Sequence, residues 1–265
     1  MTTRQTAPLH GADDGSGTPV LLLHPVGLDH RCWDAVVLRL PTGYRVLRPD
    51  LPGHGHSPAL SGTPDLAAYA AAVAEWCHGR QAIPAVVVGL SFGGMIAQTL
   101  ALEHAGMVQA LVVAGCPAGF PDPAVRAAID DRGQAALAGG MAAILEPTLD
   151  RWFTPGFRAS GGDAPTRARL LSDDAAGWAA AWRAISGLDL AHRLPEIGVP
   201  TLCIAGESDA AAPPPLLQGI ADAIPGARMA ILPRAPHMMQ IETPDAFAAR
   251  LSEFLAGLED RRNGM

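Results

Sequence analysis

The sequence predicts an α/β fold in which a mostly parallel central sheet is flanked by helices. Short apolar runs bounded by Gly or Pro recur along the chain, and segments with helical spacing lie between them. Such runs are too short for helices, and their Val, Ile and Leu content is typical of strands buried on both faces. Alternating strands and helices give an open parallel sheet, whose ligand site lies at the carboxyl ends of the strands.

The predicted strands come in chain order at residues 20–23, 44–47, 85–89, 110–114, 201–205 and 228–232. The clearest helix follows the second strand, at residues 65–77. Its apolar residues Leu66, Tyr69, Val73 and Trp76 fall at helical spacing, which gives the helix one face to bury against the sheet.

One long stretch, residues 121–194, interrupts the alternation. It has no convincing strand pattern and consists of helix-like segments rich in Ala and Arg. An insertion between two core strands lies over the carboxyl edge of the sheet. We therefore predict a helical lid on a core made of residues 1–120 and 195–265. The predicted lid contains eight of the 19 arginines, at positions 126, 132, 151, 158, 167, 169, 183 and 193.

Composition argues against several functional classes. With 265 residues, of which 49% are apolar and 17% charged, the chain suits one sizeable domain with a large core. Its formal charge of −7 argues against a nucleic-acid partner. It contains no lysine, which excludes Schiff-base and P-loop chemistry. No apolar run reaches the roughly 18 residues of a membrane span and no secretory signal is evident, so we expect a cytoplasmic protein without a membrane partner.

Cysteine and histidine spacing predicts neither a cofactor nor a metal site. The four cysteines are scattered and form no C-x-x-C pair, as expected for thiols in a reducing compartment. The one close histidine pair, His54 and His56, sits in a glycine-rich turn without an evident third ligand. No sequence feature argues for a homodimer, which stays an open alternative.

Ser91 lies at the centre of a Gly-x-Ser-x-Gly string, GLSFG at residues 89–93. The strand at 86–88 precedes it and an apolar helical segment at 95–102 follows, which is the strand–turn–helix setting of a nucleophile elbow. The start of that helix also directs its positive dipole end toward the oxyanion that forms when the serine attacks. The sequence therefore predicts Ser91 as a nucleophile.

A serine nucleophile needs a base to accept its proton, and the base needs an acid to orient it. In this fold the acid and then the histidine follow the serine, each on a loop after a strand. Asp209 follows the strand at 201–205, and His237 follows the strand that ends at residue 232. Glu207 is a competing acid, but it lies only two residues beyond its strand, where its side chain is expected to face away.

The loop after the first buried strand should supply a hydrogen-bond donor to the oxyanion. It reads His24-Pro25-Val26-Gly27. Pro25 has no N–H, so Val26 is the better donor, and the backbone N–H of Phe92 is the other. His24 ends the strand, and we expect it to shape this loop.

These motifs together are similar to the α/β-hydrolase superfamily, and the chain more narrowly resembles 3-oxoadipate enol-lactonases. The broad resemblance rests on the GLSFGG elbow, the segment DLPGHGHS at 50–57, and the loops of Asp209 and His237. The narrow resemblance lies in RWFTPGFRA at 151–159, GWAAAWRAISGLDL at 177–190, PTLCIAGESDAAAPP at 200–214 and IPGARMAILPRAPHMMQIETPDAF at 224–247. It extends over residues 18–257 and implies the α/β-hydrolase fold.

The resemblance implies hydrolysis of a small lactone or ester through an acyl-enzyme on Ser91. It also implies that Trp152 and lid arginines line the substrate pocket. An enol-lactone of this type carries a carboxylate, which Arg binds well, and Arg151 and Arg31 are the candidates. The chain departs from the family in its oxyanion loop, which reads HPVG rather than NSLG. The hairpin that usually precedes the first buried strand is predicted to be missing or much reduced.

Three alternatives remain beside ester or lactone hydrolysis. A carbon–carbon-bond hydrolase uses the same three residues on a ketonic substrate. A cofactor-free haloperoxidase, acting as a perhydrolase, replaces water with peroxide at the acyl-enzyme. A non-catalytic ligand-binding protein on the same fold is less favoured, because the Ser, His and Asp residues are all present.

Overall fold

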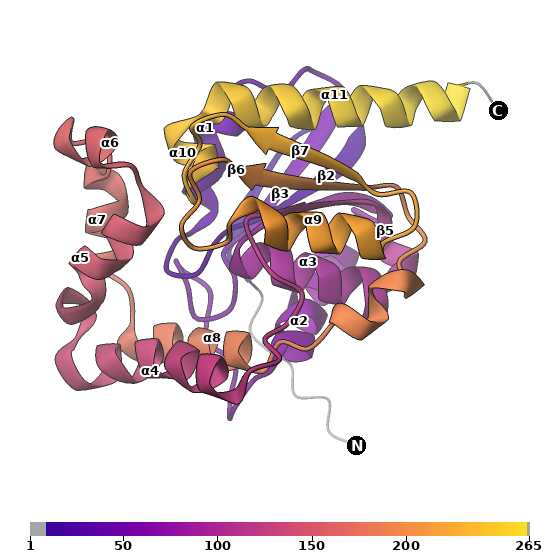
Figure 1. Cartoon of the computed structure of the whole chain (residues 1–265). Coiled ribbons are helices and arrows are strands. Elements are labelled where there is room, and N and C mark those ends of the chain that lie inside the picture. The colour runs from indigo at the N-terminus through magenta and orange to yellow at the C-terminus, as the bar shows by residue number, and fades with distance from the viewer. Residues whose placement is uncertain (1–8, 264–265) are drawn as a thin grey trace.

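A single seven-stranded sheet forms the centre of the molecule (Figure 1). The computed structural model describes residues 9–263. The strands are β1 (Gly11–Gly15), β2 (Thr18–Leu23), β3 (Tyr44–Pro49), β4 (Ala85–Leu90), β5 (Val108–Ala114), β6 (Thr201–Gly206) and β7 (Arg228–Leu232). Their order is β1-β3-β2-β4-β5-β6-β7, and all neighbours are parallel except β1 and β3. The predicted α/β architecture is confirmed.

The six strands expected from apolar runs are all present, and their ends lie within two residues of the expected ones. Strands β4 and β6 are buried along their whole length, as expected for strands covered by helices on both faces. Their carboxyl ends lead directly into Ser91 and Glu207, so the sheet brings the chemistry-bearing loops to one edge.

Strand β1 was not expected from the sequence. Its segment GADDG is polar and glycine-rich, which is unusual for a strand. It runs antiparallel to β3 at the edge of the sheet, and Asp13 forms a two-bond ion pair with Arg45 of β3. In the described residues, the segment before β2 forms one short edge strand that pairs with β3 and not with β2. The expected loss or reduction of a hairpin before β2 stays a prediction, because residues 1–8 lie outside the described part of the chain.

Helices cover both faces of the sheet (Figure 1). One face carries α1 (Asp34–Val37) and α11 (Pro244–Asn263), and the other carries α2 (Leu66–Gly79), α3 (Phe92–Glu103) and α9 (Pro214–Ala223). Asp65 caps α2 by accepting the N–H of Ala68, as its place before the helical pattern suggests. A short α10 (Met239–Glu242) and 3₁₀ turns at 30–33, 105–107 and 191–196 complete the core.

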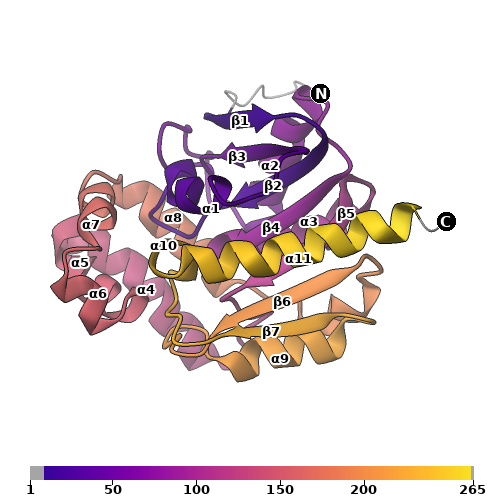
Figure 2. The same cartoon turned by 90° about the horizontal axis from the view of Figure 1, so that it is seen from above.

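Between β5 and β6 the chain forms five consecutive helices, which we call the lid. They are α4 (Pro123–Gly139), α5 (Met141–Trp152), α6 (Pro155–Ala159), α7 (Ala164–Leu171) and α8 (Ala175–Ser186). Helix α4 packs along α8, and α5 packs against α4 and α7. Figures 1 and 2 show the lid at the end of the sheet toward which the arrowheads of β6 and β7 point. None of the helices in residues 9–263 has the length and apolar character that a membrane span needs.

Candidate active site

Ser91 occupies a tight turn between β4 and α3. Its backbone has φ +54° and ψ −118°, a conformation that an L-residue adopts only when its surroundings impose it. The surroundings leave no room for side chains on the flanking glycines, because a Cβ at Gly93 would collide with the carbonyl oxygen of Leu23. A Cβ at Gly89 would collide with the carbonyl of Gly93. The glycines therefore let strand and helix approach closely and leave Ser91 raised at the sheet edge.

Three side chains from separate loops form one continuous hydrogen-bonded chain. The hydroxyl Oγ of Ser91 lies 3.0 Å from Nε2 of His237. The other ring nitrogen, Nδ1, lies 2.9 Å and 3.1 Å from the two carboxylate oxygens of Asp209. All three residues are buried. The arrangement gives Ser91 a base and the base an orienting carboxylate, which are the parts needed for nucleophilic catalysis.

Backbone groups fix the Asp209 carboxylate in place. Its Oδ1 accepts N–H bonds from Ala211 and Ala212, at 2.8 and 2.9 Å. Glu207, the competing acid, turns away from the histidine and accepts the N–H of Arg234 at the surface. The structure thus places Asp209, and not Glu207, at His237.

Val26 and Phe92 are the two residues expected to donate backbone N–H groups to an oxyanion. Phe92 begins α3, so its N–H is one of the first-turn donors that have no partner within the helix. Val26 shares a cavity wall with Ser91. Neither N–H donates to an acceptor among residues 9–263. Both residues predicted for the oxyanion hole therefore have, in the described part of the chain, a backbone N–H that is free to bind an oxyanion.

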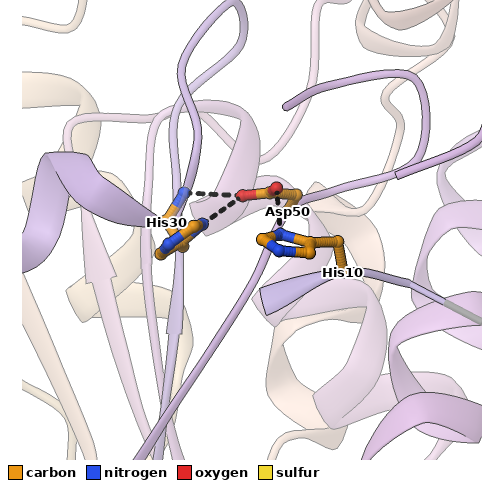
Figure 3. A group of neighbouring side chains, drawn as sticks. All are labelled: His10, His30 and Asp50. Atoms are coloured by element: carbon orange, nitrogen blue, oxygen red, sulfur yellow. Dashed lines mark hydrogen bonds and ion pairs between the residues drawn. The ribbon is translucent and has the colours of Figure 1, made fainter. Parts of the chain in front are cut away.

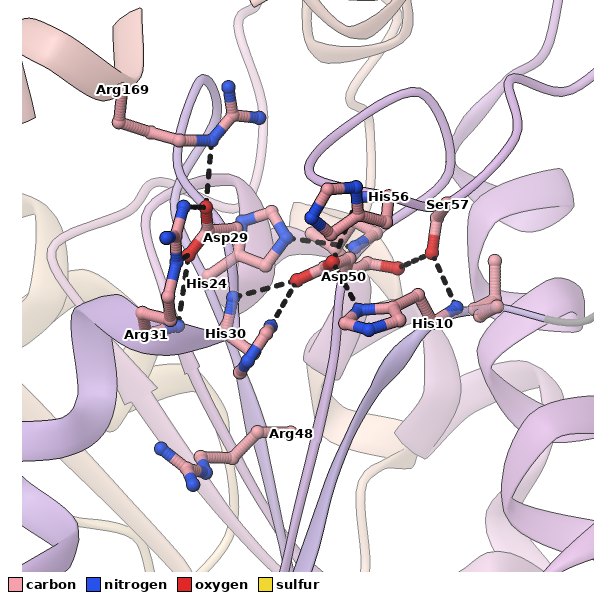
Figure 4. A network of polar contacts seen from close by, with 12 residues as sticks. His10, His24, Asp29, His30, Arg31, Arg48, Asp50, His56, Ser57 and Arg169 are labelled. Carbon is pink, nitrogen blue, oxygen red and sulfur yellow. Dashed lines mark hydrogen bonds and ion pairs between the residues drawn. The ribbon is translucent and has the colours of Figure 1, made fainter.

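The loop that carries Val26 is anchored at both ends (Figure 4). At its start, His24 donates from Nδ1 to the carbonyl of Pro25 and accepts the N–H of Leu51 at Nε2. At its end, His30 donates its backbone N–H and its ring Nδ1 to Asp50, at 2.9 and 2.6 Å. The partners in these two anchors, Leu51 and Asp50, directly follow β3. His24 therefore shapes the loop, as expected, through its hydrogen bond with Leu51.

Asp50 is the centre of this anchor (Figure 3). Within residues 9–263, Asp50, His10 and His30 are also the one group of side chains whose ligand atoms lie close enough together to hold a metal ion. These atoms all lie within 4.8 Å of one another. His10 and His30 donate to Asp50, and the backbone N–H groups of His30 and His56 also donate to it. Burial opposes ionisation, but these hydrogen bonds outweigh it and hold the Asp50 pKa well below its usual range. The group is complete as a hydrogen-bonded anchor, and His56 of the His54–His56 pair considered from the sequence contacts it through its backbone N–H.

A cavity of about 420 Å³ opens between the lid and Ser91. Trp152 and Arg151, both expected in the substrate pocket, line it. Arg132 from α4 lines the same cavity. The sequence contained no signal that singled out Arg132, because it is one of eight arginines in similar Ala-rich surroundings.

Arg31, the other arginine expected to contact substrate, lies elsewhere. It donates to both carboxylate oxygens of Asp29, at 3.0 and 2.7 Å, and lines a second cavity of about 600 Å³ together with residues of α7. It is not among the residues around the cavity at Ser91. Its position after the oxyanion loop suggested proximity to the substrate, but a sequence position does not show on which side of a loop a side chain emerges.

Comparison with known proteins gives a consistent result. The model of a family described as "Alpha/beta hydrolase family" matches residues 20–250. A pimeloyl-[acyl-carrier protein] methyl ester esterase of Vibrio vulnificus is 26% identical, covering 93% of this chain and 97% of that protein. The crystal structure of the enol-lactonase from Burkholderia xenovorans is 33% identical with a TM-score of 0.88, covering 94% and 96% of the two chains. A malate-bound thermophilic esterase from Thermogutta terrifontis is 28% identical with a TM-score of 0.89, covering 94% and 93%.

Proposed function

The chain belongs to the alpha/beta hydrolase family, and on this basis we propose that it is a serine hydrolase that cleaves a small lactone or carboxylic ester. The observation that carries the proposal is the unbroken chain of hydrogen bonds from Asp209 through His237 to Ser91. The cavity in front of Ser91 has the size of a small-molecule site.

In the first half of the proposed reaction, Ser91 Oγ attacks the acyl carbon while Nε2 of His237 accepts its proton. Asp209 holds the proton on Nδ1 and stabilises the imidazolium that forms. The N–H groups of Val26 and Phe92 stabilise the negative charge that develops on the carbonyl oxygen. The bond to the alcohol or ring oxygen then breaks, and His237 protonates that oxygen. An acyl-enzyme on Ser91 remains.

In the second half, water enters and His237 removes one of its protons. The resulting nucleophile attacks the acyl carbon, and the bond to Ser91 Oγ breaks. His237 returns the proton to Oγ and the carboxylic acid leaves. The same base and the same two donors thus serve both halves, so no additional group is required for the chemistry.

For the substrate we propose a compound of the 3-oxoadipate enol-lactone type. Support comes from the enol-lactonase of B. xenovorans, which is similar over nearly the full length of both chains. The V. vulnificus relative is an esterase acting on a methyl ester. We also propose a cytoplasmic location, supported by the free thiols of all four cysteines.

The test combines covalent labelling with turnover. A fluorophosphonate should form an adduct on Ser91, identified by mass spectrometry, and Ser91→Ala should abolish labelling and lower turnover on the order of a millionfold. Ser208→Ala, at an exposed serine on the neighbouring loop, is the control and should leave both unchanged. The substrate panel contains 3-oxoadipate enol-lactone, an uncharged lactone and a 4-nitrophenyl ester. If Ser91 stays unlabelled and no member of the panel is hydrolysed, the proposal is wrong.

A further inference from the structure

The lid arginines differ sharply in their ion pairing. Of the eight arginines in residues 121–194, six have a carboxylate oxygen within 4.0 Å: Arg126 with Asp189, Arg158 with Glu146, Arg167 with Glu146, Arg169 with Asp29, Arg183 with Asp130 and, in the 3₁₀ turn that follows the lid helices, Arg193 with Glu103. Arg132 and Arg151 have no such partner among residues 9–263. The six arginines that form ion pairs do not line the cavity at Ser91, whereas the two arginines without an ion pair in residues 9–263 do line it.

Those two arginines line the cavity that contains Ser91 and His237. Arg132 comes from α4 and Arg151 from the last turn of α5, so two separate helices deliver a guanidinium to the same space. The guanidinium of Arg132 lies over the ring of Trp182, 4.9 Å from its centroid, which orients it without neutralising it. Among residues 9–263, the one carboxylate in the cavity wall is that of Asp122, which accepts the N–H of Ala124 at the start of α4.

The pair is electrostatically unfavourable while the cavity holds no anion. Burial lowers the pKa of Arg132, and the positive charge of Arg151 lowers it further. Two like charges facing one space of low dielectric repel each other, and an anion between them removes that repulsion. Much of the rest of the wall is apolar, including Val125, Ile129 and Ile185. The cavity thus combines a cationic pair, an apolar surface and a nucleophile.

We infer that Arg132 and Arg151 together bind a free carboxylate of the substrate, so that the enzyme selects short esters or lactones that carry a negative charge away from the scissile bond. This inference rests on the proposed hydrolysis at Ser91. Guanidinium groups bind carboxylates through paired N–H···O bonds, and two of them surround one anion from two sides. The apolar wall takes the carbon chain between the carboxylate and the acyl carbon.

The test compares two esters of equal length. Mono-4-nitrophenyl adipate carries a carboxylate where 4-nitrophenyl hexanoate carries a methyl group. The wild-type enzyme should favour the adipate ester by about 30-fold in kcat/KM, the value expected for hydrogen bonds to a charged group. Arg132→Gln and Arg151→Gln should each lower kcat/KM for the adipate ester, mainly by raising KM, and so bring the ratio of the two kcat/KM values close to one. Arg183→Gln is the matched control, because Arg183 is a lid arginine that pairs with Asp130 and does not line the cavity.

A second measurement separates this inference from the proposed function. Adipate itself should bind the Ser91→Ala variant, measured by calorimetry, and binding should be lost when either Arg132 or Arg151 is also replaced by Gln. If the enzyme turns over both esters equally and adipate does not bind, the carboxylate site is wrong while hydrolysis at Ser91 stands. If Ser91 is unreactive but adipate binds through the two arginines, the carboxylate site stands and the proposed hydrolysis fails.

Discussion

The Nε2 atom of His24 accepts the backbone N–H of Leu51 at 2.8 Å, and this bond joins the ends of β2 and β3 beneath the loop that carries Val26. The ring is fully buried, and its Nδ1 donates to the carbonyl of Pro25. A protonated ring could not accept the Leu51 N–H. His24 must therefore stay neutral for the loop to keep its anchor.

This requirement predicts a pH-dependent stability. Burial, aided by the nearby His54, lowers the pKa of His24 from 6.5 to about 3. Below pH 6.5 the unfolded chain binds a proton at His24, whereas the folded chain binds one there only near pH 3. The free energy of unfolding therefore decreases as the pH falls through this range. His24→Gln keeps an acceptor for Leu51 but cannot titrate. Urea denaturation gives the free energy of unfolding of each protein at pH ~7.5 and at pH ~5. The decrease between these two pH values should be about 2 kcal/mol smaller for His24→Gln than for the wild type. Equal losses in both proteins would contradict the prediction.

Asp209 and Glu207 provide a direct test of the acid. Asp209→Asn should lower kcat about 10⁴-fold, because an amide disfavours the tautomer in which His237 carries its proton on Nδ1. Glu207→Gln changes a nearby carboxylate of the same loop that accepts the N–H of Arg234 instead. It should leave kcat within about twofold of the wild type, since surface substitutions of this kind have small effects. Steady-state kinetics of the two variants decide which carboxylate serves the histidine, and a larger loss in Glu207→Gln would reverse the assignment.

Gly27 links the oxyanion loop to the lid. Its φ is +74°, and a Cβ there would come within 2.6 Å of side-chain atoms of Leu170 and Trp178. Gly62 has a nearly equal φ of +77° but open space around it. Gly62→Ala should therefore cost about 1 kcal/mol of stability through backbone strain alone and leave kcat unchanged. Gly27→Ala adds a steric conflict and should lower kcat about tenfold or more by displacing the Val26 N–H. Equal kcat values for the two variants would show that the contact with the lid has no effect on the reaction.

The ion pair between Asp29 and Arg169 is a second link between loop and lid. The two groups lie 2.9 Å apart, with only 5% and 11% of their side chains exposed. A double-mutant cycle of Asp29→Asn and Arg169→Gln should give a coupling energy of about 1–3 kcal/mol. The exposed pair of Arg250 and Glu253 on α11 is the control, with an expected coupling below about 0.5 kcal/mol. Both cycles are measured by chemical denaturation, and similar couplings would mean that solvent screens the first pair as fully as the second.

Much of the fold could be predicted because buried parallel strands have a distinct composition. The run of Val and Ala in β4 and the Gly-rich turn after it were sufficient to place Ser91. Strand β1 was not predictable in this way, because GADDG has no alternation of apolar residues. It forms because its edge position needs only one hydrogen-bonded neighbour, and because Arg45 of β3, which lies opposite Gly15, reaches diagonally to Asp13.

The candidate site shows a similar division. Asp209 and His237 followed from the order of loops, whose positions the sheet determines. The difference between Arg31 and Arg132 did not, since both are arginines and only their neighbours distinguish them. Arg31 pairs with Asp29, which precedes it by two residues, whereas Arg132 has no carboxylate within ion-pair distance in the described part of the chain, although Asp130 and Asp131 directly precede it. Which charges are neutralised is a property of the folded neighbourhood rather than of the local sequence.

The contact of Gly27 with Leu170 and Trp178 also bears on how such enzymes diversify. A lid grafted from a relative would meet the host's oxyanion loop at this point, and its helices would have to leave the same small gap above residue 27. An exchange of the lid alone should therefore displace the loop of residues 24–30. We therefore expect a lid exchange to preserve activity only when the loop of residues 24–30, which is distant in the sequence, is exchanged with the lid.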